Sequence, residues 1–343
     1  MVFTQYFIEE KLTMNIENFS EWLHRQGYQV IRTASSCWYN AGPRVLQAFP
    51  FDWLIQPSEQ ELRELTLGKN YLAVRYSTPF DAPDGMVSYH VVLNNPYDIE
   101  MLRSQARNGI RRGLENCRVE RIGCERMAKE GWILQQDTLE RQGRSSSMKQ
   151  SEWERICNSA ADLPGFEVWA ALVGDELAAT ILTARIDDTF YVPYAQCYNK
   201  FMCLHANNAL FYVASRDMLS RDGVKRIFFS LHSLDAPPSV NDFKFRMGMI
   251  AKPVRQKIVF HPLLQPLANA LTYKSLKKWM ERYPENSFLA KTEGMLRFYL
   301  QGRRPLAEQD WPECLDTYKA NVLGMPIIEQ SGRDSHVRIR AEN

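Results

Sequence analysis

The chain lacks the features that mark membrane-spanning, secreted and nucleic-acid-coating proteins. Its 343 residues contain no run of roughly 18 apolar residues, so no transmembrane helix is predicted. Residues 1–19 contain no apolar block before a small-residue cleavage site, which is unlike a secretory signal. The 42 Lys and Arg residues nearly balance the 40 Asp and Glu residues, which argues against general nucleic-acid binding. We therefore expect a cytoplasmic protein.

Cysteine is present but unpatterned. The seven cysteines are scattered along the chain, and no C-x-x-C pair occurs. This is typical of reduced thiols in the cytoplasm rather than of a disulfide framework. Cys197 and Cys203 are the closest pair, with His205 as the one further ligand beside them. A zinc site needs a larger cluster of such ligands, so no metal is predicted.

What the chain does contain is a large apolar fraction, 45% of its residues, in a length sufficient for two domains. In the first part, residues 71–76 and 87–93 are typical of strands, and turn-forming residues separate them. A helix is predicted to follow over 98–114, because apolar residues recur there at helical spacing. Residues 117–122 are predicted to form another strand.

The second part begins after a polar, helical connector. Three antiparallel strands with tight turns are predicted from residue 166 to residue 198. A helix over 206–220 and strands over 225–231 and 254–260 follow, and the chain becomes helical and basic after Pro262.

The two parts share an order of strand, amphipathic helix and short strand, which indicates an internal duplication. Independent α+β halves with the same order are the alternative. The predicted fold is α+β, with mixed, mostly antiparallel sheets flanked by helices. The predicted division is a domain over 1–125, a helical connector over 126–161, a second domain over 162–262 and a helical extension with a tail over 263–343.

The most informative segment lies around residues 225–248. Its strand opens into a polar loop with His232 and Asp235, and a short basic helix with Phe243 and Lys244 follows. Proteins with α/β architecture often place a reaction centre where a buried strand opens into a loop. An ordinary strand-to-helix turn would have the same pattern.

Three motifs in order carry a resemblance to a known family. Residues 107–112 have the pattern Arg-x-x-Ile-Arg-Arg, residues 138–143 have Thr-x-x-Arg-x-Gly, and residues 243–248 have Phe-Lys-x-x-x-Gly. Over residues 20–262 the chain resembles the Fem-type (FemAB-like) branch of the GNAT-like acyl-CoA N-acyltransferase superfamily.

The resemblance implies two tandem GNAT-like acyltransferase domains, the second of which holds most of the site. It implies transfer of an acyl or aminoacyl group to an amine of a cell-envelope or small-molecule acceptor. Relatives in the branch add amino acids to cell-wall precursors from charged tRNA, so a tRNA-dependent aminoacyl transferase is one alternative. A non-catalytic GNAT-like binding scaffold is another.

One departure from the family concerns the cofactor. Members that use acyl-CoA hold its pyrophosphate in a glycine-rich loop whose backbone N–H groups face the phosphates. The corresponding residues 199–208 include no glycine, and a Cβ at each position hinders that close approach. Lys200, Asn207 and Asn208 are left to attract a phosphate. Acyl-CoA is therefore disfavoured, and a tRNA-linked or other donor gains weight.

Acyl transfer to an amine requires a group that stabilises the oxyanion and a group that takes the proton. We assign the first role to Lys244 and the second to His232 or Asp235. Phe243 is a candidate to pack under the acceptor. Ordinary structural roles for the same residues are the alternatives.

Two further groups are candidates for substrate binding. Tyr191, Tyr194 and Tyr198 lie on one predicted strand, and alternation puts Tyr191 on the face opposite the other two unless a bulge intervenes. Arg107 and Arg111 share a helix face and could dock a phosphate or RNA. Core tyrosines and a solvated helix face are the alternatives. The basic, aromatic helix over 273–279 could contact an anionic membrane surface or pack on the core.

Overall fold

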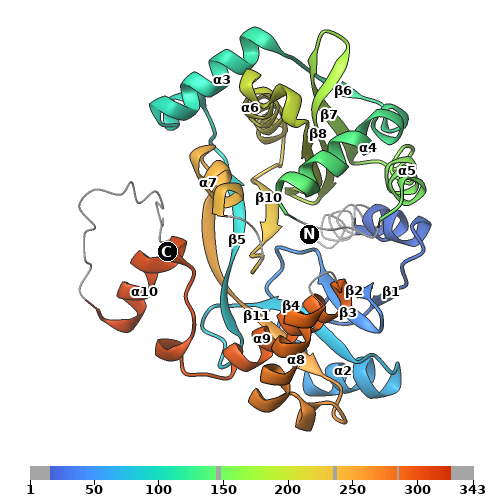
Figure 1. Cartoon of the computed structure of the whole chain (residues 1–343), viewed down its shortest axis with the longest axis vertical. Coiled ribbons are helices and arrows are strands. Elements are labelled where there is room, and N and C mark those ends of the chain that lie inside the picture. The colour runs from blue at the N-terminus through green and yellow to red at the C-terminus, as the bar shows by residue number, and fades with distance from the viewer. Residues whose placement is uncertain (1–15, 144–147, 235–237, 284–285, 326–343) are drawn as a thin grey trace, which may run out of the picture. The chain divides into compact units, whose positions relative to one another are not determined.

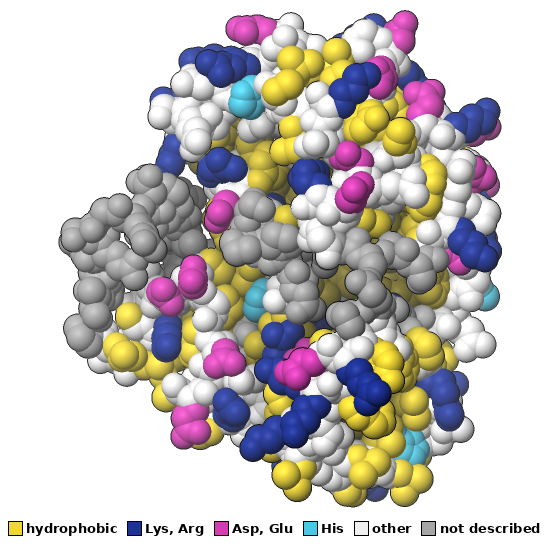
Figure 2. Space-filling view, viewed as in Figure 1, with side chains coloured by type: hydrophobic (Ala, Val, Ile, Leu, Met, Phe, Trp, Pro, Cys, Tyr) yellow, Lys and Arg dark blue, Asp and Glu magenta, His cyan; other side chains and the backbone are white. Residues whose placement is uncertain are grey.

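The computed structural model describes residues 16–143, 148–234, 238–283 and 286–325. The chain forms two compact units. Unit 1 combines Met1–Gly27, Val91–Ser230 and Asp235–Met249, and unit 2 combines Tyr28–His90, Leu231–Leu234 and Ile250–Asn343. On the face shown in Figure 2, basic and acidic side chains are interspersed, in line with the net charge of +2.

Unit 2 is built on strands in the order β1-β2-β3-β4-β11 (Figure 1). Neighbouring strands are antiparallel except for β3 and β4, which are parallel. Their bounds are Val30–Arg32 for β1, Cys37–Gly42 for β2, Val45–Phe49 for β3, Ala73–Thr78 for β4 and Ile250–Phe260 for β11. The helices of this unit are α2 (Glu59–Arg63), α8 (Ala270–Arg282), α9 (Ser287–Gly302) and α10 (Asp316–Leu323).

Alternation along β4 gives unit 2 a core on each face of its strands. Val74 packs on one face in a cluster with Trp38, Leu46 and Tyr76, which Leu62 of α2 adjoins. Ala73 points to the other face and packs with residues of β11 and α9. Ser58 begins α2 by accepting a hydrogen bond from the backbone N–H of Glu61, as an N-cap serine does.

Unit 1 is built on strands in the order β10-β9-β8-β7-β6, antiparallel except for β9 and β10, which are parallel. Their bounds are Arg118–Ile122 for β6, Phe166–Val173 for β7, Glu176–Ile186 for β8, Thr189–Cys197 for β9 and Arg226–Leu231 for β10. Strand β5 (Met86–Asn94) carries the chain from unit 2 into unit 1. The helices of unit 1 include α3 (Ser104–Asn116), α4 (Cys124–Arg141), α5 (Gln150–Asn158), α6 (Ala206–Ser220) and α7 (Pro238–Arg246).

Aromatic residues fill the core of unit 1. Phe19, from a helical segment over 16–25, stacks on Phe166 of β7 and contacts Tyr191 of β9. Phe229 of β10 stacks on Phe211 of α6. Because Phe228 contacts Tyr191 and successive strand residues alternate, segment 16–25 and α6 cover opposite faces of the strands.

The predicted fold class is confirmed: both units are α+β, with mixed, mostly antiparallel strands flanked by helices. Both also contain antiparallel strands, then a helix, then a strand that returns parallel to the last one, as in β3–α2–β4 and β9–α6–β10. The predicted antiparallel strands over 166–198 are present as β7, β8 and β9. No helix in the described ranges is both long and apolar enough to cross a membrane.

The first half of the duplication differs from the one predicted. Strands β1, β2 and β3 were not predicted, because they are short and interrupted by polar residues. The helix and strand before residue 122 were assigned to the first half, but β6 pairs with β7 and α3 lies within unit 1. The predicted boundaries at 125, 161 and 262 stay predictions about independent folding.

Candidate functional site

The first and last residues of the Phe-Lys-x-x-x-Gly motif fix α7 in place. The ring of Phe243 meets Phe211 of α6 edge-on, with 5.3 Å between centroids. Gly248 has φ of +87°, and a Cβ there would lie 2.9 Å from Leu102 Cδ2. A glycine just past the end of a helix permits this left-handed turn, which leads into β11. Lys244 is thereby held between two anchored positions.

The side chain of Lys244 reaches back to the central strand of unit 1. Its Nζ donates a hydrogen bond to Ser230 Oγ at 2.8 Å, and the residue is half-buried. By alternation Ser230 shares a face of β10 with Phe228, which is also the face of Tyr191. The ammonium group is therefore fixed near the end of β10 rather than extended into solvent.

The strands β9 and β10 separate close to this ammonium group. They pair over three residue pairs, from Arg226 with Thr189 to Phe228 with Tyr191. Strand β9 continues to Cys197 without further pairing to β10. Pro193 has no N–H to donate, which is consistent with the end of the ladder.

A β-bulge in β9 changes which tyrosines share a face. Tyr191 is opposite Ala184 and Tyr194 is opposite Leu182, so two residues of β9 face one residue of β8. Simple alternation, which put these tyrosines on opposite faces, is wrong here: Tyr191 contacts Phe19 and Tyr194 contacts Trp22 of the same helical segment.

The three tyrosines have different surroundings. Tyr191 is 2% exposed and packs in the core, whereas Tyr194 is half-buried, with the ring of Trp153 edge-on at 5.6 Å. Tyr198 lies past the end of β9, next to Phe201. It lines a cavity of about 360 Å³ beside α4. The structure therefore brings Tyr191 and Tyr194 together and leaves Tyr198 apart.

The structure describes one of the two candidate proton acceptors. His232 belongs to unit 2, where its backbone N–H donates to Tyr89 O and its ring stacks on that tyrosine at 4.5 Å. Burial raises the pKa of the Cys314 thiol, which adjoins the hydroxyl of Tyr89, to about 12. Asp235 lies outside the described residues.

Of the two predicted arginines, Arg107 forms a hydrogen bond within the unit and Arg111 is exposed to solvent. The guanidinium of Arg107 donates to Leu102 O at 2.7 Å and so fixes the residue that packs under Gly248. Arg111 is exposed on α3, as are Arg103 and Arg112. This part of α3 could contact a phosphate-bearing ligand through exposed guanidinium groups.

Two of the three residues suggested for a pyrophosphate, Lys200 and Asn208, are already engaged. Lys200 forms an ion pair with Glu176 at 2.8 Å, on the surface. The backbone N–H groups of Asn208 and Ala209, in the first turn of α6, donate to His205 O at 3.0 and 3.2 Å. Asn207, beside them, is half-buried.

Helix α3 also covers this end of α6. A Cβ on Gly113 would lie 2.6 Å from His205 O, and a Cβ on Gly109 would lie 3.1 Å from the side-chain nitrogen of Asn208. The two glycines allow the helices to approach closely at the point where a phosphate would bind.

A polar network crosses the strands of unit 2. Arg75 donates to Gln256 Oε1 at 2.9 and 2.6 Å, and its guanidinium lies 4.7 Å from the centre of the Phe298 ring. Burial lowers the pKa of Arg75 to about 10. Gln256 donates to Ser77 Oγ, which lies 2.8 Å from His90 Nε2. The network orients the side-chain amide of Gln256.

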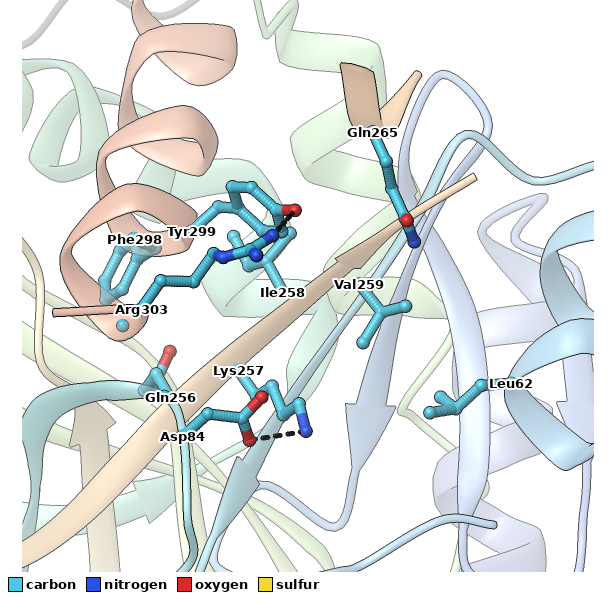
Figure 3. A pocket seen from close by; sticks show the side chains of 12 residues that line it. Leu62, Asp84, Gln256, Lys257, Ile258, Val259, Gln265, Phe298, Tyr299 and Arg303 are labelled. Carbon is cyan, nitrogen blue, oxygen red and sulfur yellow. Dashed lines mark hydrogen bonds and ion pairs between the residues drawn. The ribbon is translucent and has the colours of Figure 1, made fainter. Parts of the chain in front are cut away.

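A cavity of about 480 Å³ lies beside Gln256 in unit 2 (Figure 3). Phe298 and Tyr299 of α9 and Arg303, just after it, lie on one side of the cavity, and Leu62 of α2 lies across from them. The guanidinium of Arg303 donates to the hydroxyl of Tyr299. Lys257 and Asp84 form an ion pair at 2.5 Å in its wall. Apolar walls with basic groups suit an organic anion with an apolar body.

Neither Ser230 nor this unit 2 cavity was predicted from the sequence. Serine at the end of a strand is too common to indicate a functional site. An arginine in the middle of the apolar strand over 71–76 was an available signal, because a buried charge requires partners. The cavity itself joins Leu62, Gln256 and Arg303, which only the folded chain brings together.

No family model matches the chain, and no curated protein matches it in sequence. Its structure resembles the crystal structure of FemX, with a TM-score of 0.51 over 72% of this chain and 92% of FemX, at 11% identity. The chain has the FemX fold. A conserved protein of unknown function from Bacteroides thetaiotaomicron has a TM-score of 0.50 over 72% of this chain and 90% of its own, at 11% identity. The resemblance to the Fem-type branch is thereby confirmed for the fold.

Proposed function

We propose that the chain is an N-acyltransferase that moves an acyl or aminoacyl group to an amine of a cell-envelope or small-molecule acceptor. The observation that carries the proposal is the ammonium group of Lys244, bonded to Ser230 where β9 and β10 separate. The FemX fold supports a GNAT-like transferase. The proposed reaction centre belongs to unit 1, which contains both residues.

The chemistry assigned to Lys244 is stabilisation of charge. The amine nitrogen attacks the carbonyl carbon of the donor, and the carbonyl oxygen becomes an oxyanion. The bond to the leaving group then breaks, and the amine loses a proton. A fixed ammonium group stabilises the oxyanion without reorganising during the reaction. The base stays open between His232 and Asp235.

We further propose that the donor is not an acyl-CoA held at the start of α6. Residues 199–208 lack glycine, and the N–H groups of Asn208 and Ala209 are bonded to His205. The close contact of Gly113 with His205 also leaves little space there. A pyrophosphate needs accessible N–H groups, and the bond of Asn208 N–H to His205 O leaves fewer of them in the first turn of α6.

Charged tRNA is the alternative donor that the exposed arginines of α3 support. Arg103, just before α3, and Arg111 and Arg112 within it are exposed, and such groups bind phosphates through charge-assisted hydrogen bonds. Because Arg107 is bonded to Leu102, Arg111 is the better residue to change. If Arg111 contacts a phosphate, Arg111→Ala should reduce the slope of log K for RNA binding against log salt concentration by about one, because one counterion fewer is released.

The test combines labelled donors with variants of Lys244. Transfer from radiolabelled acyl-CoA and from aminoacyl-tRNA to a panel of amines would be measured for the wild type and for Lys244→Ala. We expect transfer from one donor class, and a loss of kcat by about 100- to 1000-fold in the variant, as when an oxyanion donor is removed.

The matched control is Lys225→Ala, at the other end of β10. Lys225 is 72% exposed and pairs with Asp188, so its removal should leave transfer within about twofold. Circular dichroism would show that both variants are folded. Full activity of Lys244→Ala would remove the proposed role of this residue.

A binding scaffold is the second candidate function, and the cavity of unit 2 favours it. That cavity has apolar walls and basic groups but does not involve Lys244. A small-molecule screen by thermal shift would distinguish the two candidates. Ligands that stabilise wild type and Lys244→Ala equally, together with no transfer from either donor, would support a scaffold.

A further inference from the structure

Large apolar side chains are exposed in one short segment of unit 2. The six residues are between 54% and 78% exposed: Leu263, Leu267, Leu271, Trp279, Tyr283 and Phe288. Single exposed apolar residues are normal on a protein surface, but a cluster marks an interaction site. Two of these residues precede α8, two lie within it, one follows it directly and one is at the start of α9.

Helix α8 is attached to the unit by one face. None of its residues is buried, and Tyr273, Leu276 and Met280 are the half-buried ones. The hydroxyl of Tyr273 donates to Glu293 of α9 at 2.8 Å. At 3.6 residues per turn, the opposite face carries Leu271, Lys278 and Arg282. That face is directed to solvent.

The exposed face is also basic. Its exposed cations include Lys274, Lys278 and Arg282. Two more exposed lysines lie nearby in the chain: Lys277, whose ammonium group lies over the ring of Tyr273, and Lys291 of α9. Among the described residues of this segment, Glu281 is the one exposed carboxylate. Figure 2 shows hydrophobic and basic side chains next to each other at the end of the view where Figure 1 draws α8. The surface therefore combines apolar side chains with an excess of positive charge.

We infer that α8 docks unit 2 on an anionic lipid surface. Lysine and arginine are attracted to acidic head groups, tryptophan and tyrosine prefer the interface, and leucine enters the acyl region. A protein partner explains the composition less well, because protein interfaces are depleted in lysine. A second copy bound through the same face would bring like charges together.

The test is sedimentation of the full chain with large vesicles of phosphatidylcholine, with and without phosphatidylglycerol. We expect binding to the anionic vesicles, weakened by added salt, and a blue shift of tryptophan fluorescence. The double variant Leu271→Ser/Trp279→Ser should reduce the partition coefficient at least tenfold, and Lys278→Glu/Arg282→Glu should do the same. These residues are not buried, so the variants should fold.

The matched control is Leu67→Ser, which removes a 50% exposed leucine elsewhere in unit 2 and should leave vesicle binding unchanged. Equal binding to neutral and anionic vesicles, or none to either, would overturn the inference. So would a dimer, measured by analytical ultracentrifugation, that dissociates in Leu271→Ser/Trp279→Ser while vesicles are not bound. That result would assign the surface to a second copy of the chain.

Discussion

Arg75 shows how a charged side chain is stabilised in the core of unit 2. Burial lowers the pKa of its guanidinium, yet at about 10 the group stays protonated at neutral pH. Gln256 accepts its hydrogen bonds and Phe298 offers an aromatic face, which together compensate for lost water. The polar groups around Arg75 are thus joined in one network, and the titration of its members is linked to stability.

His90 gives a prediction about pH at this scale. It is 1% exposed, and burial, assisted by Lys252, lowers its pKa to about 3. The unfolded chain binds this proton near pH 6.5, so the free energy of unfolding should fall as the pH drops below that value. Urea unfolding at pH 7 and pH 4.5 should show a loss about 2.5 kcal/mol larger in the wild type than in His90→Gln.

The control for that experiment is His24→Gln, because His24 is exposed. Its loss between the two pH values should match that of the wild type. If His90→Gln lost as much stability as the wild type, the folded protein would have to accommodate a charged His90, contrary to the pKa given by its burial.

At the scale of elements, α3 packs closely on α6 in the region where a cofactor was predicted to bind. Helix α3 approaches α6 through Gly109 and Gly113, and this contact covers the first turn of α6. The helical pattern of α3 could be predicted from its spacing, since Ala106 and Ile110 are buried as expected. Its partner could not, because α6 is far along the chain.

Gly113→Ala tests this contact directly. The added Cβ would lie 2.6 Å from His205 O and 2.9 Å from Ala209 Cβ, so we expect destabilisation by about 1–3 kcal/mol. Gly294→Ala in α9 is the matched control, because no atom lies within 4 Å of its Cβ. This variant should stabilise by about 0.5–1 kcal/mol, as alanine is the better helix former. Urea midpoints measure both, and similar stabilisation by both changes would contradict the helix contact.

At the scale of the whole molecule, the chain passes between the two units several times. The transitions follow Gly27, His90, Ser230, Leu234 and Met249. Each unit is therefore assembled from distant segments, and the core of unit 1 needs Phe19 and Trp22 from its first segment. A contiguous piece of the chain does not contain a complete core.

A fragment of residues 162–262, the predicted second domain, tests this interleaving. It contains Phe166 and Tyr194 but lacks Trp22 and Trp153, which pack on them. We expect circular dichroism of an unfolded chain and no cooperative thermal transition, because the apolar faces are uncovered. A cooperative transition like that of the full chain would instead support the predicted boundaries.

The sequence by itself determined the α+β class, the antiparallel strands β7 to β9 and the Phe-Lys-x-x-x-Gly motif. These depend on residues close together in the chain, whose alternation or spacing sets the local conformation. Only the tertiary structure decided that Lys244 meets Ser230, that a bulge turns Tyr191 and Tyr194 to one face, and that α8 exposes its leucines. Each of these is a matter of contacts between distant residues, which local pattern does not encode.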